Sequence, residues 1–254
     1  SWRPQTQIVR GGTRRSAFDE TSEAIFMTSG FVYDSAEQAE ARFLGDDEGY
    51  IYSRYGNPTV SMFEERLAQI DGSEACFATA SGMAAVFAAL LCQLQSGDHV
   101  VASRALFGSC HYILTQLLPR YGIKVDLVDG ADLSQWQAKI NDGTTVVFFE
   151  TPSNPTLDLI DLEAVIELAH GVGARVVVDN VFSTPILQRP AEYGADVVVY
   201  SGTKHMDGQG RILGGAVLSS EAFIADHLMN FMRHTGPAMS AFNAWVLLKG
   251  LETM

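Results

Sequence analysis

Basic residues are scarce in this chain. Its 254 residues include 17 Lys and Arg against 30 Asp and Glu, which gives a formal net charge of −13, and they contain no basic run. Phosphate backbones and anionic lipid surfaces bind clusters of positive charge. The sequence therefore excludes nucleic acid and membrane surfaces as partners.

Long apolar runs are also missing. The longest, Met83 to Cys92, has ten residues, which is about half of the roughly 20 that cross a bilayer. The opening residues, Ser1 to Pro4, contain no apolar signal segment. We therefore expect neither a membrane span nor a secretory leader.

Cysteine is sparse as well. Cys76, Cys92 and Cys110 cannot all pair with one another, and none lies in a C-x-x-C or Cys/His metal-binding pattern. This usage is typical of the reducing cytoplasm and predicts no metal site. Cys76 and Cys92 lie in apolar runs, where a free thiol behaves as a small buried hydrophobe, so we assign no cysteine a catalytic role.

Short β-rich runs alternate with helical patterns from about residue 75 onward. Val176–Val178 and Val197–Val199 are apolar without interruption, as strands buried on both faces should be. The pattern predicts an α/β fold, with a mostly parallel sheet sandwiched between helices. We expect strands at 75–79, 99–103, 124–129, 145–150, 175–179, 196–200 and 213–219, and helices near 61–71, 82–95, 109–121, 132–141, 161–172 and 241–254.

Residues 1 to about 60 lack sustained periodicity and contain polar stretches such as Asp46-Asp47-Glu48. We expect residues 1–60 to form an N-terminal arm and residues 61–254 to form one large domain. No internal repeat is visible, so a repeat array is excluded. The helical pattern that starts at Ala241 runs to the last residue without a cap, which predicts that the sequence is incomplete.

Polar residues at the carboxyl ends of strands mark the expected ligand site, because open α/β sheets bind ligands at that edge. Ser81-Gly82-Met83 follows an apolar strand and opens a helix, whose free N–H groups favour an anion such as phosphate. Asp179 ends another apolar strand. A buried carboxylate there needs a cation, such as a protonated pyridine ring. A structural turn and a salt bridge are the alternatives at these two positions.

Lys204 leaves a third apolar strand, close behind two hydroxyl residues. Desolvation at the strand end would free its amine to act as a nucleophile, and Ser201 and Thr203 could hold a phosphate. A solvated lysine is the alternative. Asp179 precedes Lys204 by one strand and one crossover, so both are expected at the same edge of the sheet. Asn154, in a loop with two prolines, can present an amide there, unless it only stabilises a turn.

Four short motifs occur in order along the chain. They are Tyr50–Thr59 (YIYSRYGNPT), Ser81–Ala85 (SGMAA), Val178–Asn180 (VDN) and Ser201–Lys204 (SGTK). Together they resemble the Cys/Met-metabolism family of fold-type I enzymes that depend on pyridoxal 5′-phosphate (PLP). The family includes cystathionine synthases and lyases, methionine γ-lyases and homoserine-ester sulfhydrylases. The resemblance runs through essentially the whole chain and implies a PLP-dependent enzyme.

The resemblance implies a role for each matched residue. Lys204 would hold PLP as a Schiff base and later move protons on the substrate. Asp179 would pair with the pyridine nitrogen, Phe107 would stack on the ring, and Asn154 would help to hold the substrate carboxylate. The implied phosphate ligands are Ser201, Thr203 and the backbone at Gly82 and Met83, with Tyr52 and Arg54 reaching the phosphate of a neighbouring subunit.

Quaternary structure is also implied by the resemblance. The family implies a homodimer or homotetramer whose active sites are shared between subunits, with the arm 1–60 contacting the neighbour. It further implies a C-terminal small domain, which supplies an arginine for the substrate carboxylate. We expect that domain to be absent from this chain.

Two segments narrow the choice within the family. Phe107 stands where the family usually has tyrosine, and it lacks the hydroxyl that could move a proton or contact a leaving group. Phe107–Cys110 and Lys204–Arg211 (KHMDGQGR) resemble the O-succinylhomoserine sulfhydrylase branch. The implied reaction is γ-replacement, which converts O-succinylhomoserine and sulfide to homocysteine and succinate in methionine biosynthesis. Arg211 is a hypothetical partner of the succinyl carboxylate, unless it is a solvated loop residue.

Several alternatives stay open. Within the family they are cystathionine γ-synthase and methionine or cystathionine γ-lyase. A nicotinamide dehydrogenase would suit the α/β pattern, but no G-x-G-x-x-G follows the first strand. A non-catalytic binding protein on the same fold is the third alternative, and the presence of both Lys204 and Asp179 argues against it. The sequence does not select between succinyl and acetyl esters, or between sulfide and cysteine.

Overall fold

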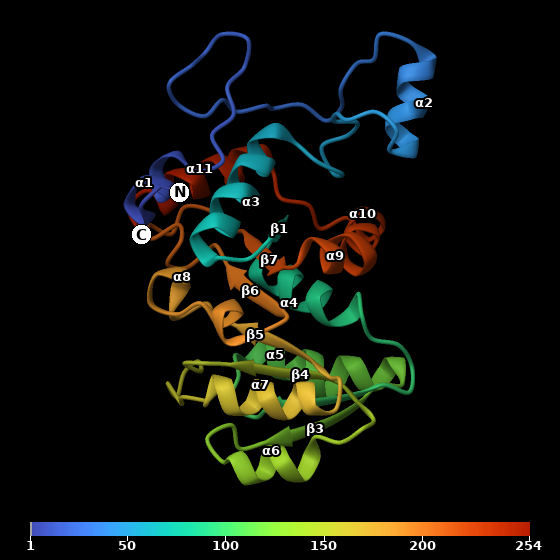
Figure 1. The fold of residues 1–254 in the computed structure, drawn as a ribbon, viewed down its shortest axis with the longest axis vertical. Coiled ribbons are helices and arrows are strands. Elements are labelled where there is room, and N and C mark those ends of the chain that lie inside the picture. Colours follow the sequence, from blue (N-terminus) through green and yellow to red (C-terminus); the bar gives the residue numbers. More distant parts are fainter. Residues whose placement is uncertain (1) are drawn as a thin grey trace.

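A computed structural model gives the fold of residues 2–254. Its centre is a seven-stranded sheet in the order β1-β7-β6-β5-β4-β2-β3 (Figure 1). Strands β2 to β6 run parallel, whereas β7 is antiparallel to both of its neighbours. The strands are β1 (Ala75–Thr79), β2 (His99–Ser103), β3 (Lys124–Val128), β4 (Thr144–Glu150), β5 (Arg175–Asp179), β6 (Val197–Ser201) and β7 (Gly215–Ser219).

All seven strands lie where the apolar patterning predicts them, with ends that differ by two residues at most. The predicted α/β class and the mostly parallel sheet are confirmed. The continuous valines of β5 and β6 are buried, because helices cover both faces of the sheet.

Side chains alternate between the two faces along each strand, so both faces of the sheet are apolar and both are covered by helices. Val100 and Val146 pack with the first group of helices, whereas their neighbours Val101 and Val147 pack on the opposite face. The first group is α4 (Gly82–Leu91) with the helical segments 108–121 and 221–235. The second group is α6 (Leu133–Lys139), α7 (Leu162–Gly171), α3 (Pro58–Asp71) and α11 (Ala241–Leu251). Among residues 2–254, no helix has the length and apolar content needed to cross a membrane.

Two helical segments contain a π-helical turn. The first is α5 (Gly108–Tyr112), which continues through the π turn Ile113–Leu117 and ends in a 3-10 turn. The second runs from α9 (Glu221–Phe223) through Ile224–Leu228 into α10 (Met229–Thr235). This second segment is not among the predicted helices, although its buried apolar residues recur at helical spacing.

The predicted arm contains two helices that the sequence analysis does not predict, α1 (Pro4–Arg10) and α2 (Ala36–Leu44). The N-cap Ser35 accepts a hydrogen bond from the N–H of Gln38 at 3.1 Å, and Gly45 ends α2 with a φ of 86°. Neither helix contains a buried residue. Local capping therefore marks both ends of α2. In Figure 1 the blue segment between α1 and α3 extends away from the sheet.

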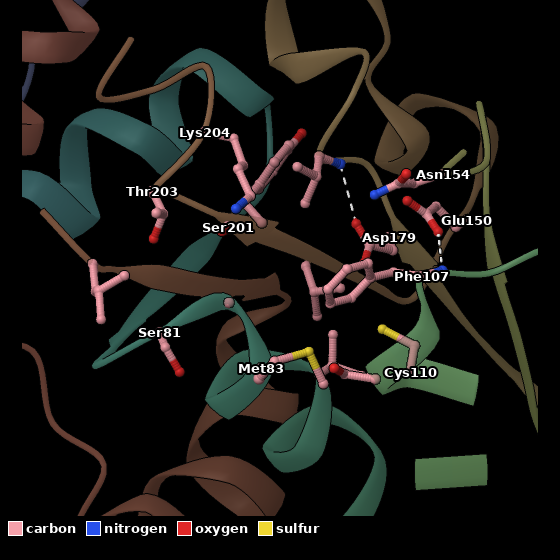
Figure 2. A pocket seen from close by; sticks show the side chains of 17 residues that line it. Ser81, Met83, Phe107, Cys110, Glu150, Asn154, Asp179, Ser201, Thr203 and Lys204 are labelled. Atoms are coloured by element: carbon pink, nitrogen blue, oxygen red, sulfur yellow. Dashed lines mark hydrogen bonds between the residues drawn. The ribbon is translucent and has the colours of Figure 1, made fainter. Parts of the chain in front are cut away.

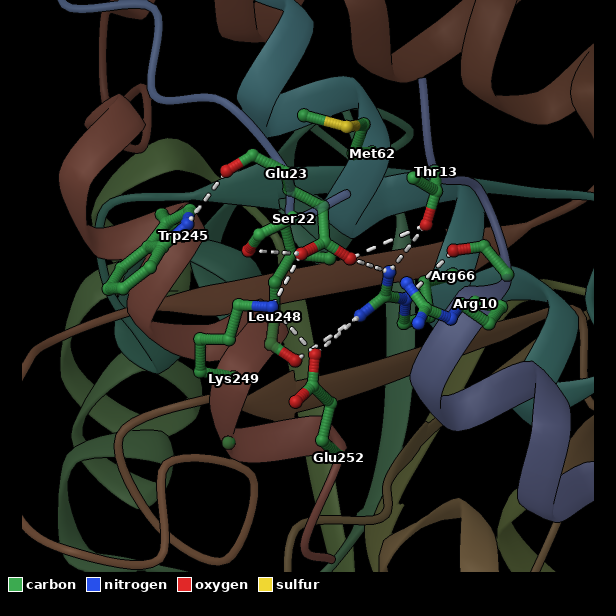
Figure 3. Close-up of polar contacts among 12 residues, drawn as sticks. Arg10, Thr13, Ser22, Glu23, Met62, Arg66, Trp245, Leu248, Lys249 and Glu252 are labelled. Atoms are coloured by element: carbon green, nitrogen blue, oxygen red, sulfur yellow. Dashed lines mark hydrogen bonds and ion pairs between the residues drawn. The ribbon is translucent and has the colours of Figure 1, made fainter. Parts of the chain in front are cut away.

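A buried ion cluster, which we call the arm-root cluster (Glu23, Arg66 and Lys249), fastens the arm to the body (Figure 3). Arg66 of α3 has a fully buried side chain that pairs with Glu23 and donates to the carbonyl of Gly11 at 2.8 Å and to the hydroxyl of Thr13 at 3.1 Å. Burial opposes ionisation of Glu23, but hydrogen bonds from Lys249 and Arg66 outweigh it and lower its pKa to about 2. The arm root is therefore a satisfied charge network.

The three cysteines are free thiols. Burial raises the pKa of Cys92 to about 12 and raises the pKa values of Cys76 and Cys110 further. Thiolate nucleophiles need a lowered pKa. The structure thus agrees with the interpretation of these thiols as inert.

Candidate active site

A cavity of about 280 Å³ opens at the carboxyl ends of the strands. Figure 2 shows side chains from separate strands and loops gathered around it. The sequence-predicted site residues that line it are Gly82, Met83, Phe107, Asn154, Asp179, Ser201, Thr203 and Lys204. The structure therefore brings together eight of the ten predicted residues and leaves Tyr52 and Arg54 outside.

The start of α4 forms one wall of the cavity. Ser81 is the N-cap, and its Oγ accepts a hydrogen bond from the N–H of Ala84 at 3.2 Å. A Cβ on Gly82 would lie 2.6 Å from the Cβ of Ser201, so only glycine allows the helix to approach β6 this closely. The result is a helix N-terminus beside a serine hydroxyl, which is an arrangement suited to an anion.

Asp179 forms the base of the cavity. It is 5% exposed, and its Oδ1 accepts a hydrogen bond from the N–H of Val181 at 3.1 Å. Burial, followed by the negative charge of Glu150, raises its pKa to about 8. Within residues 2–254 Asp179 takes part in no ion pair. A buried carboxylate in this state is a binding place for a cation.

Glu150 is a cavity residue to which sequence reasoning gives no role. It ends β4 at the register position beside Asp179 and is 3% exposed. Its Oε2 accepts a hydrogen bond from the N–H of Phe107 at 2.8 Å, and burial raises its pKa. Glu150 obeys the strand-end rule that identifies Asp179, so that rule applied evenly would have found it.

Lys204 lies on the turn after β6, at the rim of the cavity. The turn is closed by a hydrogen bond from the N–H of Gly208 to the carbonyl of Lys204 at 2.9 Å. The predicted desolvation of the amine is wrong for this chain, since the residues that the structure describes leave Lys204 exposed. The polypeptide leaves the buried strand at Ser201, and the lysine follows three residues later, on a turn without cover.

The two hydroxyl residues before Lys204 differ. The Oγ1 of Thr203 accepts a hydrogen bond from the N–H of Gly214 at 3.1 Å and donates to its carbonyl at 3.3 Å. Thr203 therefore fixes the turn to the segment that precedes β7. Ser201 faces the start of α4 at Gly82, so it is the better placed of the two to bind an anion there.

Tyr52 and Arg54 lie on the arm, apart from this cavity. The guanidinium of Arg54 lies over the ring of Tyr55, 4.9 Å from its centroid, and donates to the carbonyl of Arg233. Tyr52 forms an antiparallel bridge with Gly30. Their predicted contact is with a neighbouring subunit, so it stays a prediction.

A buried hydrogen-bond chain joins the strand ends behind the cavity. The hydroxyl of Tyr200 donates to Asp71 at 2.6 Å and accepts from Asn180 at 2.8 Å. The side-chain carbonyl of Asn180 accepts from Gln188 at 2.8 Å, and Gln188 also donates to the carbonyl of Thr151 at 2.9 Å. This chain connects α3 with the ends of β6, β5 and β4, which fixes their relative positions.

Arg211 does not line the cavity. Its Nε donates to Oδ1 of Asp207 at 2.8 Å, and its N–H donates to the other carboxylate oxygen at 2.6 Å. The guanidinium therefore stabilises its own loop, and the structure gives no support to Arg211 as a partner of the succinyl group.

Comparison with known proteins identifies the family. The model of the family described as "Cys/Met metabolism PLP-dependent enzyme" matches residues 5–254. The chain belongs to this family. The resemblance found in the four sequence motifs is thereby confirmed.

Two curated relatives show where the chain lies within the Cys/Met metabolism family. An O-succinylhomoserine sulfhydrylase of Mycobacterium tuberculosis is 61% identical over 246 residues, which are 97% of this chain and 61% of that protein. An L-methionine gamma-lyase of Porphyromonas gingivalis is 41% identical over 251 residues, which are 98% of this chain and 63% of that protein. The chain thus spans about three fifths of the length of these relatives.

A solved structure from Campylobacter jejuni superposes with a TM-score of 0.94 at 29% identity, over all of this chain and 71% of that one. That protein carries N′-pyridoxyl-lysine-5′-monophosphate, a lysine joined to the cofactor. The fold-type I assignment is therefore confirmed.

The cavity fits the cofactor of the Cys/Met metabolism family. Asp179 is a buried carboxylate that pairs with no cation among the residues that the structure describes, and the pyridine ring of PLP can supply one. The start of α4 with Ser201 suits the phosphate, and Lys204 is an amine at the rim of the same cavity. The PLP dependence predicted from sequence is the property of the family to which the chain belongs.

Proposed function

We propose that this protein catalyses γ-replacement, converting O-succinylhomoserine and sulfide to homocysteine and succinate in methionine biosynthesis. The observation that carries this proposal is the single cavity that joins an amine, a cation-binding carboxylate and an anion-binding helix start. The choice of substrate is supported by the 61% identity to the M. tuberculosis sulfhydrylase.

The polar residues of the cavity have separable tasks in this reaction. The cofactor, when bound, supplies an electron sink for charge that develops on the substrate. Asp179 holds the ring cation that makes this possible. Ser201 and the N–H groups at Gly82 and Met83 hold the phosphate, which fixes the position of the ring. The amine of Lys204 removes the proton from the substrate Cα and moves protons at Cβ, so that succinate leaves Cγ and sulfide adds there.

Two further residues orient the reactants. Phe107 contributes a ring at the cavity that stacks on the cofactor without offering a proton, because it has no hydroxyl. Asn154 places its amide at the cavity, where it binds the substrate carboxylate. Because Phe107 has no hydroxyl, we assign the proton steps to Lys204.

Product analysis tests the substrate. Purified protein is supplied with PLP and O-succinylhomoserine, with sulfide or cysteine as nucleophile, and the products are measured by mass spectrometry. We expect homocysteine and succinate with sulfide, a slower reaction with O-acetylhomoserine, and no turnover by Lys204→Ala. Cystathionine from cysteine at a higher rate would instead identify a cystathionine γ-synthase. Release of methanethiol from methionine would identify a methionine γ-lyase.

We further propose that the protein acts as a homodimer or homotetramer with shared active sites. Arg54 and Tyr52 belong to the segment 1–60 and do not line the cavity of their own chain. The arm also exposes large apolar side chains, with Phe18 and Val32 both 91% exposed. Such surfaces are typical of interfaces, and a neighbouring copy of the chain is the partner we propose.

Complementation in trans tests this arrangement. Lys204→Ala and Arg54→Ala damage the same active site from different subunits, so each homo-oligomer should be impaired. Mixed and refolded oligomers should regain up to about a quarter of the wild-type sites on statistical grounds, because one of the sites in a mixed dimer is intact. Lack of any recovery in mixtures that sedimentation shows to contain hetero-oligomers would contradict shared sites.

The division of the chain and its location are also proposals. We propose that residues 1–60 form the arm that contacts the neighbour and residues 61–254 form the PLP-binding large domain. The free thiols of Cys76, Cys92 and Cys110 support a reducing compartment, the cytoplasm.

A further inference from the structure

The ends of β4 and β5 place two carboxylates side by side. Glu150 and Asp179 are register partners on adjacent parallel strands, which lie about 4.8 Å apart. Register partners in a parallel pair point to the same face of the sheet. Both residues line the cavity and are at most 5% exposed, and Figure 2 shows the two carboxylates close together.

The groups around this pair offer little compensation. Besides the pair, the titratable side chains that face the same cavity are Cys110 from α5 and Lys204 from the turn after β6. Tyr200 lines the cavity from β6, but its hydroxyl is bound to Asp71 and Asn180 behind it. Burial raises the pKa of Cys110 and that of Tyr200, so neither supplies charge. Burial, then the charge of Glu150, raises the pKa of Asp179 to about 8. Two adjacent buried carboxylates are stabilised by one shared positive charge.

Glu150 also contacts the loops that carry the other cavity residues. Its Oε2 accepts the N–H of Phe107 at 2.8 Å, and the nearby backbone of Asn154 partly offsets the effect of burial on its pKa. One carboxylate thus lies beside the aromatic loop, the amide loop and Asp179. Removing the Glu150 carboxylate therefore changes the charge at the base of the cavity and also the position of the Phe107 ring.

We propose that Glu150 is a positioning residue that acts with Asp179 as a carboxylate pair, keeping the proton on the cofactor's pyridine nitrogen and tying the Phe107 loop to it. The inference rests on the family's cofactor and is independent of the substrate proposed above. Failure of the sulfhydrylase assay therefore leaves it standing.

Nitrogen-15 NMR of bound PLP labelled at the ring nitrogen tests the charge part of the proposal. The chemical shift reports directly whether that nitrogen carries a proton, and it is recorded against pH without any substrate. In Glu150→Gln the loss of the ring proton should move to lower pH by about one unit, since a neighbouring negative charge is removed. The dissociation constant of PLP should also increase by about tenfold.

Two variants separate charge from contact. Glutamine keeps an oxygen that can accept the N–H of Phe107 but removes the charge. Glu150→Asp keeps the charge but is too short to reach that N–H, so the nitrogen titration should stay near that of the wild type while PLP affinity falls. Glu167→Gln, an exposed change on α7, is the control for a general effect of charge.

The same pair can be tested in the cofactor-free protein. Infrared difference spectra between the wild type and Asp179→Asn isolate the carboxyl band of Asp179. In a Glu150→Gln background this band should titrate at lower pH than in the wild-type background. A nitrogen titration and a carboxyl titration that are both unchanged in Glu150→Gln would overturn the proposal, as would a Glu150→Asp variant that titrates like Glu150→Gln.

Discussion

The active-site cavity and the arm root both bury carboxylates, but with opposite results. At the arm root, Glu23 meets Arg66 and Lys249, and its pKa falls to about 2 despite burial. In the cavity, Asp179 meets another carboxylate and its pKa rises to about 8. Burial is common to both places, so the difference lies in the partners. A charge network that is complete within the chain stabilises the fold, whereas an incomplete one marks the place of a ligand.

The largest expected effect comes from the incomplete site. Asp179→Asn should reduce kcat/KM with PLP present by a factor on the order of 10³, because the ring cation loses its partner. The same change should leave the free energy of unfolding of the cofactor-free protein unchanged or higher. Steady-state rates and denaturant titrations measure the two quantities. Asp142→Asn, on the surface, should change neither.

For the arm-root cluster, whose charges are balanced within the chain, we expect an effect on stability. Glu23→Gln leaves Arg66 buried with one less anion, so the free energy of unfolding should fall by about 3 kcal/mol. Chemical denaturation measures this. Glu65→Gln is the control, since Glu65 makes an exposed ion pair with Arg14 that contributes less than about 1 kcal/mol. Equal effects of the two substitutions would show that the buried network stabilises the fold no more than an exposed ion pair does.

The two carboxylates also predict opposite pH dependence for the cofactor-free protein. The pKa of folded Glu23 is about 2, below its ordinary value, so its contribution is present above about pH 4.5 and is lost as pH falls toward 2. The pKa of folded Asp179 is about 8, above its ordinary value, so the fold gains stability as pH falls from about 8 toward 4.

Thermal unfolding from pH 2 to 9 measures how stability changes with pH in the acidic range, where Glu23 titrates, and in the alkaline range, where Asp179 titrates. The difference between wild type and Asp179→Asn isolates the alkaline slope, and Glu23→Gln should remove the acidic one. An alkaline slope that persists in Asp179→Asn would show that another buried group causes it.

The smallest expected effect concerns a charge that belongs to neither region. Arg211 is paired with Asp207 and does not line the cavity. Arg211→Ala should therefore leave the ratio of kcat/KM for succinyl and acetyl esters unchanged within about twofold. A drop for the succinyl ester alone would restore Arg211 as its partner.

Much of the fold can be predicted from the sequence, because burial on both faces leaves an uninterrupted apolar signal. β5 and β6 show this best, with three consecutive valines each. Helices α1 and α2 contain no buried residue, so they leave no uninterrupted apolar run in the sequence and were not predicted. The antiparallel direction of β7 was not predicted either, since direction depends on how the chain enters the sheet and not on the residues within the strand.

The site was predicted to a similar extent. Strand-end positions and family motifs identify Lys204, Asp179 and the α4 start, which the sheet places around one cavity. The exposure of Lys204 could not be predicted, because it depends on what covers the turn after β6. Glu150 and the chain through Tyr200 depend on side-chain contacts between strands that are far apart in sequence.

The place of β7 in the sheet sets an order for assembly during synthesis. Among the seven strands of the described residues, β1 pairs with β7 alone, and β7 lies between β1 and β6. The contact between Gly82 and Ser201 therefore depends on a strand that ends at Ser219. On the ribosome, the parallel strands can pair as they emerge, but the half of the cavity that we propose to bind phosphate must wait for the last strand. A nascent chain that stops before β7 should consequently have the lysine but no place to seat the cofactor.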